Sequence, residues 1–166
     1  MFGSRVFLKS RHLLLTTLIP FSLLFSGLAS AKTVKEILAL SEAPPGVVFE
    51  ILAPNPQQWQ RIQPRLMDAI ASLRSTFPSI DIAVVSHGNE QFALTTENES
   101  KFPRLHQGVR ELGESGVDVH VCETFASWSN ITADAFPDYV DVAPSGPAQI
   151  NNYVAMGYLL VDQFAF

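Results

Sequence analysis

Hydrophobic and polar positions alternate in blocks along the chain after residue 46. Short runs rich in β-branched and aromatic residues predict strands at 47–52, 79–86, 117–122, 139–142 and 158–161. Between these runs, apolar residues recur every three or four positions, which predicts helices at 57–77, 101–115, part of 123–135 and 145–156. Strands that alternate with helices through short turns indicate a mainly parallel sheet. The predicted fold class is α/β, a three-layer α/β/α sandwich around a five-stranded sheet.

Three residues refine the predicted helices. Pro64 lies inside the 57–77 pattern and predicts either a kink or a later helix start. Ser145 precedes a helical segment and has the side chain of an N-cap residue. His106 lies on the polar side of the 101–115 helix, so we expect it at the surface.

The first 31 residues follow a different pattern. Basic residues at 5, 9 and 11 precede an uncharged, mainly apolar run from 13 to 28, which ends in Ala29-Ser30-Ala31. A basic start, a short apolar run and an A-x-A end are typical of a secretory signal peptide. The alternative is an uncleaved anchor helix, but the run of about 16 residues is shorter than the roughly 20 needed to span a bilayer. We therefore expect cleavage near Ala31, a periplasmic or secreted protein, and no stable membrane insertion afterwards.

Cleavage there leaves an N-terminal tail or short helix at 32–45 and one domain at 46–166. The full chain has a net charge of −5, and removal of three basic residues and no acidic residue lowers it to about −8. Such an acidic domain is a poor nucleic-acid binder, because nucleic acids bind to basic surfaces. The sequence contains neither a Walker A motif nor GxGxxG, so no nucleotide cofactor is predicted.

The single cysteine, Cys122, is the main candidate for chemistry. One cysteine excludes an internal disulfide, a CxxC redox pair and a four-cysteine zinc site. It ends the third predicted strand just before a helix, whose N–H groups stabilise a thiolate. The alternative is a small buried side chain with no reactivity.

Two histidines lie near the same predicted sheet edge, where ligands bind in parallel α/β folds. His120 precedes Cys122 by two residues and so leaves the same face of its strand, and His87 ends the second strand. We predict Cys122, His120 and His87 as the catalytic residues. A metal or small-ligand site formed by the same three residues is an alternative, but HxxxH and CxxC spacings are lacking, and no metal is predicted.

Three segments occur in a characteristic order: IDIAVVSHGN, then LGESGVDVHVCETF, then VAPSGPAQINNYVAMGYLLV. Together they resemble the DsrE/DsrF-like family of small sulfur-metabolism proteins, over about residues 46–162. The resemblance implies a three-layer fold around a five-stranded sheet, usually assembled into trimers or hexamers. It also implies that a cysteine at the place of Cys122 carries sulfur as a persulfide between partner proteins. The export signal departs from the cytoplasmic sulfur-relay members, so their partners do not carry over.

Two functions of different classes follow from these observations. The first is an exported persulfide carrier or sulfur-relay component acting through Cys122, with sulfur transfer as its activity and donor and acceptor proteins as partners. The alternative is a non-catalytic oligomeric interaction module in which Cys122 is structural. Two C-terminal aromatic residues, Phe164 and Phe166, either form a subunit contact or fold back on the sheet.

Overall fold

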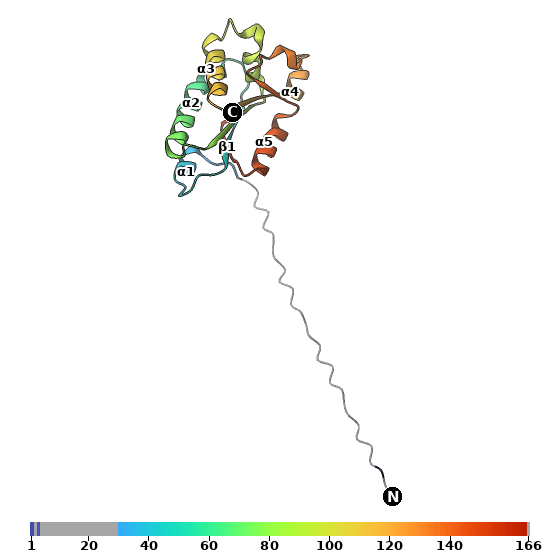
Figure 1. The fold of residues 1–166 in the computed structure, drawn as a ribbon. Coiled ribbons are helices and arrows are strands. Elements are labelled where there is room, and N and C mark those ends of the chain that lie inside the picture. The colour runs from blue at the N-terminus through green and yellow to red at the C-terminus, as the bar shows by residue number, and fades with distance from the viewer. Residues whose placement is uncertain (2, 4–29, 166) are drawn as a thin grey trace.

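A computed structural model describes residue 1, residue 3 and residues 30–165 (Figure 1). The predicted signal peptide lies almost entirely outside these residues, and so does Phe166. In the part that is described, no helix has both the length and the apolar character needed to cross a membrane. Five strands form one sheet: β1 (Gly46–Leu52), β2 (Asp81–Ser86), β3 (Val117–Cys122), β4 (Asp141–Ala143) and β5 (Leu159–Ala165).

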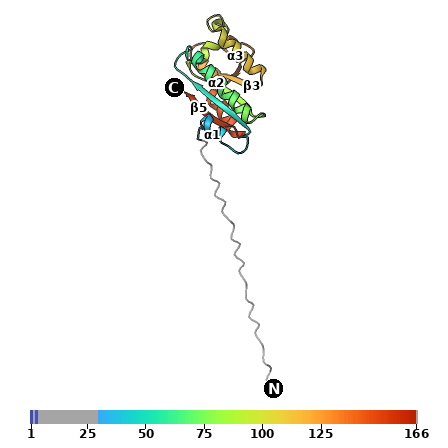
Figure 2. The same cartoon turned by 90° about the vertical axis from the view of Figure 1, so that its left-hand side faces the viewer.

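The sheet has the order β4-β3-β2-β1-β5, and all neighbouring strands are parallel. The helices and 3-10 turns are α1 (Val34–Leu38), α2 (Gln58–Thr76), η1 (Asn89–Leu94), η2 (Thr96–Asn98), α3 (Pro103–Glu114), α4 (Glu123–Ser127), η3 (Ala133–Ala135) and α5 (Gly146–Ala155). Figure 1 shows α2 and α3 on one side of the sheet and α5 on the other. In Figure 2, which views the molecule from the α2 side, these two helices lie in front of the strands. The three-layer α/β fold is confirmed.

The two faces of the sheet bury apolar side chains in separate clusters. The larger cluster fills the space between the sheet and α2 and α3, and it includes Trp59, which is fully buried. The smaller cluster lies under α5 and consists of Val48, Ala83, Val85, Ile150 and Tyr153. Burial on both faces explains why β1 and β2 are nearly continuous apolar runs instead of alternating ones.

The segment before β1 forms a short helix that belongs to the folded body. Thr33 and Glu36 form a capping box at the start of α1, with the backbone N–H of Thr33 donating to Glu36 Oε2 at 2.7 Å. Ile37 is fully buried in the larger cluster. The backbone N–H of Lys32 donates to the carbonyl of Leu160 at 2.8 Å, so contact with the sheet begins at residue 32.

Three expectations about single residues change. Helix α2 begins at Gln58 and is continuous across Pro64, so a later start was wrong. His106 is 1% exposed, not at the surface, because Tyr139 and η1 cover it: its Nδ1 lies 2.6 Å from the Tyr139 hydroxyl and its Nε2 lies 2.9 Å from the Ala93 carbonyl. Phe164 lies inside β5, because this strand runs to Ala165 and not only to residue 161 as predicted; it is fully buried, with its ring centre 5.9 Å from that of Phe49.

Candidate functional site

Three side chains lie side by side at the carboxyl edge of the sheet, on the face that α5 covers. Glu50 on β1 is paired with Val85 on β2, one of the residues under α5. Ser86 on β2 is paired with Val121 on β3, so His87 and Cys122 are the next residues in the same register. Alternate residues of a strand share a face, and Glu50, His87 and Cys122 therefore belong to three neighbouring strands of one face. The sequence predicted two of the three.

Gly146, at the start of α5, lies against both His87 and Cys122. A β-carbon built on Gly146 would lie 2.5 Å from His87 Cβ and 3.3 Å from Cys122 Cβ, which places these two Cβ atoms within about 6 Å of each other. A cavity of about 170 Å³ opens at this point, and it is lined by His87, Cys122, Thr124, Phe125, Trp128, Ser145 and Pro147. The thiol and one candidate imidazole therefore share one small cavity.

The Cys122 side chain occupies the N-cap position of α4. The backbone N–H of Phe125 donates to Cys122 Sγ at 3.4 Å, as expected for a sulfur atom that replaces the usual N-cap oxygen. Cys122 is only 4% exposed, whereas Trp128 on the rim is 74% exposed. The thiol is therefore recessed behind an open aromatic rim.

Two consecutive buried residues of η1 fix the ends of three strands around this cavity. Glu90 accepts hydrogen bonds from Ala53 N at 2.6 Å, Ser86 Oγ at 2.7 Å and Gly88 N at 2.9 Å. Gln91 accepts from Cys122 N at 2.8 Å and donates to the Cys122 carbonyl at 3.3 Å. Both side chains are fully buried. They complete the backbone hydrogen bonding where the sheet ladder ends, and so hold the loops that carry His87 and Cys122.

His120 faces a different set of partners. Its Nε2 lies 2.8 Å from the Tyr153 hydroxyl, which donates to Asp118 Oδ2 at 3.1 Å, and its Nδ1 lies 4.0 Å from Asp141 Oδ2. Burial lowers the pKa of His120, although Asp141 and Asp118 act in the opposite direction. Burial also raises the pKa of Tyr153 strongly, and the neighbouring Asp118 adds to the effect. His120 therefore belongs to a polar chain under α5 and does not line the Cys122 cavity.

The Cys122 cavity lies where two chain connections diverge. After β3 the chain enters α4, whose Ala126 packs in the larger cluster, and after β4 it enters α5 on the opposite face. Thr124 joins the two ends through Thr124 Oγ1, which donates to the Pro144 carbonyl at 2.6 Å. Open parallel sheets bind ligands at such divergence points. The position of the cavity thus favours a binding role.

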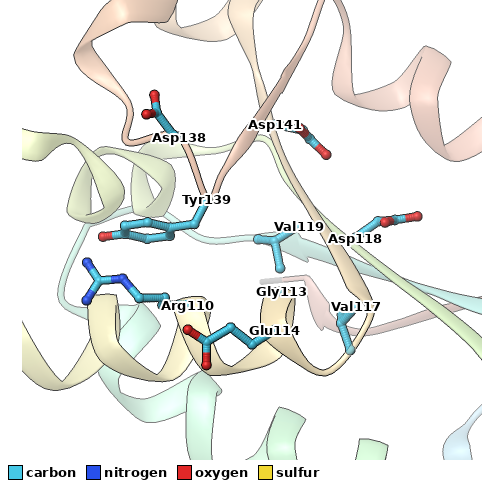
Figure 3. A pocket seen from close by; sticks show the side chains of 9 residues that line it. All are labelled: Arg110, Gly113, Glu114, Val117, Asp118, Val119, Asp138, Tyr139 and Asp141. Carbon is cyan, nitrogen blue, oxygen red and sulfur yellow. The ribbon is translucent and has the colours of Figure 1, made fainter.

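A second cavity, larger than the one at Cys122, lies beside the first half of β3. It has a volume of about 490 Å³ and is lined by Arg110, Gly113, Glu114, Val117, Asp118, Val119, Asp138, Tyr139 and Asp141. Figure 3 shows Arg110 beside the Tyr139 ring, and the guanidinium carbon lies 4.5 Å from the ring centre. Its lining includes no cysteine and no histidine, so it contains none of the predicted site residues.

Residues 47–162 match the DsrE/DsrF-like family. This chain belongs to the DsrE/DsrF-like family. Family membership associates it with sulfur relay in general. A protein of unknown function from Methanobacterium thermoautotrophicum, MTH1491, has a similar structure, with a TM-score of 0.57 and 23% sequence identity over 70% of this chain and 96% of that chain. That likeness supports the fold alone, and no curated protein matches the sequence.

Sequence reasoning missed two residues near this cavity. Glu50 contacts His87 and Gln91 contacts the Cys122 backbone, and only the fold brings these pairs close. Glu50 did leave a signal, because it is the only charged residue in the run GVVFEIL. Within residues 30–165, no three side chains of His, Cys, Asp or Glu are grouped closely enough to bind a metal ion.

Proposed function

We propose that this protein is an exported sulfur carrier that accepts a sulfane sulfur on Cys122 and passes it on as a persulfide. The observation that carries the proposal is the position of its single cysteine. Cys122 ends β3, accepts a hydrogen bond from Phe125 N, and lines a cavity at the carboxyl edge of the sheet in a member of a sulfur-relay family. A lone thiol in an oxidising compartment has no internal partner for a disulfide.

The reaction is an exchange at sulfur. The Cys122 thiolate attacks the outer sulfur of a donor persulfide R–S–SH, and a new S–S bond forms as the donor S–S bond breaks. The donor leaves as R–S⁻ and takes up the proton that Cys122 lost, so the products are Cys122–S–SH and R–SH. One sulfane sulfur changes carrier without net oxidation. The reverse exchange with an acceptor thiol unloads the protein.

The cavity indicates which part of a donor reaches the sulfur. At about 170 Å³ it admits the end of a side chain or of a small thiol compound and excludes a folded domain. Phe125 and Trp128, whose ring centres are 5.4 Å apart, form an apolar border beside it. Donor and acceptor proteins would therefore present their sulfur on a protruding group. Assembly into trimers or hexamers is proposed from the family resemblance.

Persulfide loading of the purified protein tests this function. After incubation with glutathione persulfide, we expect intact-protein mass spectrometry to show a gain of one sulfur atom that is lost on reduction. Cys122→Ala should gain none, and a protein with one exposed surface thiol serves as the loading control. A wild-type protein that stays unmodified while the surface-thiol control is loaded would falsify the proposal.

The alternative, an interaction module with an inert Cys122, is favoured by the low exposure of this residue. It predicts that a small alkylating reagent labels the native thiol slowly and labels it rapidly only after unfolding. It also predicts that Cys122→Ala leaves the oligomeric state unchanged. Fast labelling of the native protein would exclude it.

A further inference from the structure

Glu50 places a carboxylate in a strand that is otherwise apolar. The sequence of β1 is GVVFEIL, and its neighbours Phe49 and Ile51 are fully buried. Glu50 Oε1 lies 2.8 Å from His87 Nε2, and the two side chains are only 22% and 10% exposed. Removing a charged carboxylate from water costs free energy unless a hydrogen-bond partner compensates for it. Its partner is the imidazole that lines the Cys122 cavity.

A carboxylate that accepts from one nitrogen of an imidazole also fixes the other nitrogen. With the proton of neutral His87 on Nε2, Nδ1 keeps its lone pair. Nδ1 is the ring nitrogen nearer to Cβ, and the Cβ atoms of His87 and Cys122 are within about 6 Å of each other. Nδ1 is therefore the His87 nitrogen that remains free to act on the thiol.

We propose that Glu50 is a positioning residue that holds His87 as the Nε2–H tautomer, so that His87 Nδ1 exchanges a proton with the sulfur on Cys122. This inference rests on the sulfur-carrier function proposed above. The Cys122 S–H proton moves to Nδ1, the thiolate attacks the outer sulfur of the donor, and the donor S–S bond breaks. The leaving thiolate R–S⁻ then takes the proton from Nδ1. The carboxylate of Glu50 stabilises the imidazolium between these two transfers.

The other titratable groups near the cavity are not placed to exchange a proton with Cys122 or to orient His87. His120 uses Nε2 for the Tyr153 hydroxyl and does not line the cavity. Glu90 is occupied by three hydrogen-bond donors from the strand ends. Glu123 follows Cys122 directly, but its side chain is exposed. Within the described residues, the pair of Glu50 and His87 is the arrangement of a general base with its orienting carboxylate.

The first test reads the tautomer directly. In the wild-type protein, ¹⁵N chemical shifts of the imidazole nitrogens should show His87 with its proton on Nε2. Glu50→Ala should give a mixture of tautomers. Glu50→Gln should retain the wild-type tautomer, because its amide oxygen still accepts a hydrogen bond. A wild-type His87 with the proton on Nδ1 overturns the proposal without any kinetic measurement.

The second test measures the rates at which Cys122 is alkylated and takes up sulfur. Glu50→Ala should slow both iodoacetamide labelling of Cys122 and sulfur uptake from glutathione persulfide by at least about tenfold, with Glu50→Gln between it and the wild type. Glu42→Ala, which removes an exposed carboxylate from the loop before β1, should leave both rates unchanged. If Glu50→Ala does not fold, His87→Gln takes its place, with the same loss expected.

The outcomes separate this inference from the carrier function. Wild-type rates in Glu50→Ala or in His87→Gln overturn the role of the pair and leave the carrier function standing. A wild-type protein that takes up no sulfur overturns the carrier function. The tautomer and the labelling rates then still decide whether Glu50 positions His87.

Discussion

At the scale of single residues, the site depends on one position that has no side chain. Gly146 lies against His87 and Cys122, and a methyl group there would be 2.5 Å from His87 Cβ. We expect Gly146→Ala to push the two residues apart or to tilt the start of α5. The resulting overpacking should cost about 1–3 kcal/mol of unfolding free energy. Urea unfolding and the rate of Cys122 alkylation measure the two effects.

Gly113 offers the matched control. It lies in α3, and a β-carbon built there has its nearest neighbour, the Tyr139 carbonyl oxygen, at 4.0 Å. Gly113→Ala should be neutral or stabilising by up to about 1 kcal/mol, because alanine favours a helix more than glycine does. If Gly146→Ala behaves in the same way, Gly146 does not determine the spacing of His87 and Cys122.

His120 makes stability depend on pH. Because burial lowers its pKa from the ordinary value of 6.5, the unfolded chain binds a proton at higher pH than the folded protein does. Stability is therefore present above about pH 6.5 and is lost as the pH falls through the lower folded pKa. We expect a lower urea midpoint at about pH 5.5 than at about pH 7.5, and a smaller difference in His120→Gln. An equal difference in both proteins would show that other groups cause it.

The residue scale also shows what sequence patterns can identify. Cys122 was recognisable as a residue at a strand end before a helix, and the structure places it there, as the N-cap of α4. The partners of the site residues were not recognisable, since Gln91 is 31 positions away from Cys122 and Glu50 is 37 positions away from His87. His106 was misread because the residues that cover it, Tyr139 and Ala93, come from other segments. Local periodicity shows which side of a helix is polar, but it does not show which other segments of the chain cover that side.

At the scale of elements, η1 does more than connect β2 to the next helix. Glu90 and Gln91 bind the ends of β1, β2 and β3 through buried hydrogen bonds. Gln91→Leu would leave the backbone N–H and C=O of Cys122 without these partners in a buried position. We expect a loss of about 1–3 kcal/mol in unfolding free energy and faster hydrogen exchange at Cys122.

Asn89 is the matched control for Gln91, because it lies in the same turn and its side chain is exposed. Asn89→Ala should change the unfolding free energy by no more than about 0.5 kcal/mol. Equal stability of Gln91→Leu and Asn89→Ala would mean that the Cys122 backbone finds other partners. Alkylation of both variants shows whether the thiol becomes more accessible.

The elements themselves were largely predictable, and their boundaries less so. Strong periodicity indicated α2 and α3, and runs rich in β-branched and aromatic residues indicated β1 to β3. The short strand β4 was placed at 139–142 but covers Asp141–Ala143, because the chain turns where Val140 N donates to the Pro137 carbonyl. The order of the strands was not predictable from the pattern, since it depends on which faces pack together. Without that order, Glu50 and His87 had no reason to be paired.

At the scale of the whole molecule, the tightly packed face of the sheet and the cavity at Cys122 lie in different places. Helices α2 and α3 close one face of the sheet over the larger cluster, while the carboxyl edge near α4 and α5 carries the Cys122 cavity. Residues 32–38 also pack on the folded domain, through the contacts of α1 and through the hydrogen bond from Lys32 N to the Leu160 carbonyl. A chain cut after Ala31 would retain every one of these contacts.

The proposed export leads to a prediction about the chain as synthesised. If Ala29-Ser30-Ala31 is a signal-peptidase site, expression of the full chain in a Gram-negative host should yield a periplasmic protein whose first residue is Lys32. Ala31→Leu should block cleavage, because the enzyme reads small side chains at both Ala positions. Ser30→Leu should be processed normally, since the middle position is not read. Mass spectrometry of the periplasmic and membrane fractions decides the matter: an intact N-terminus in the wild type would contradict cleavage and favour an anchor.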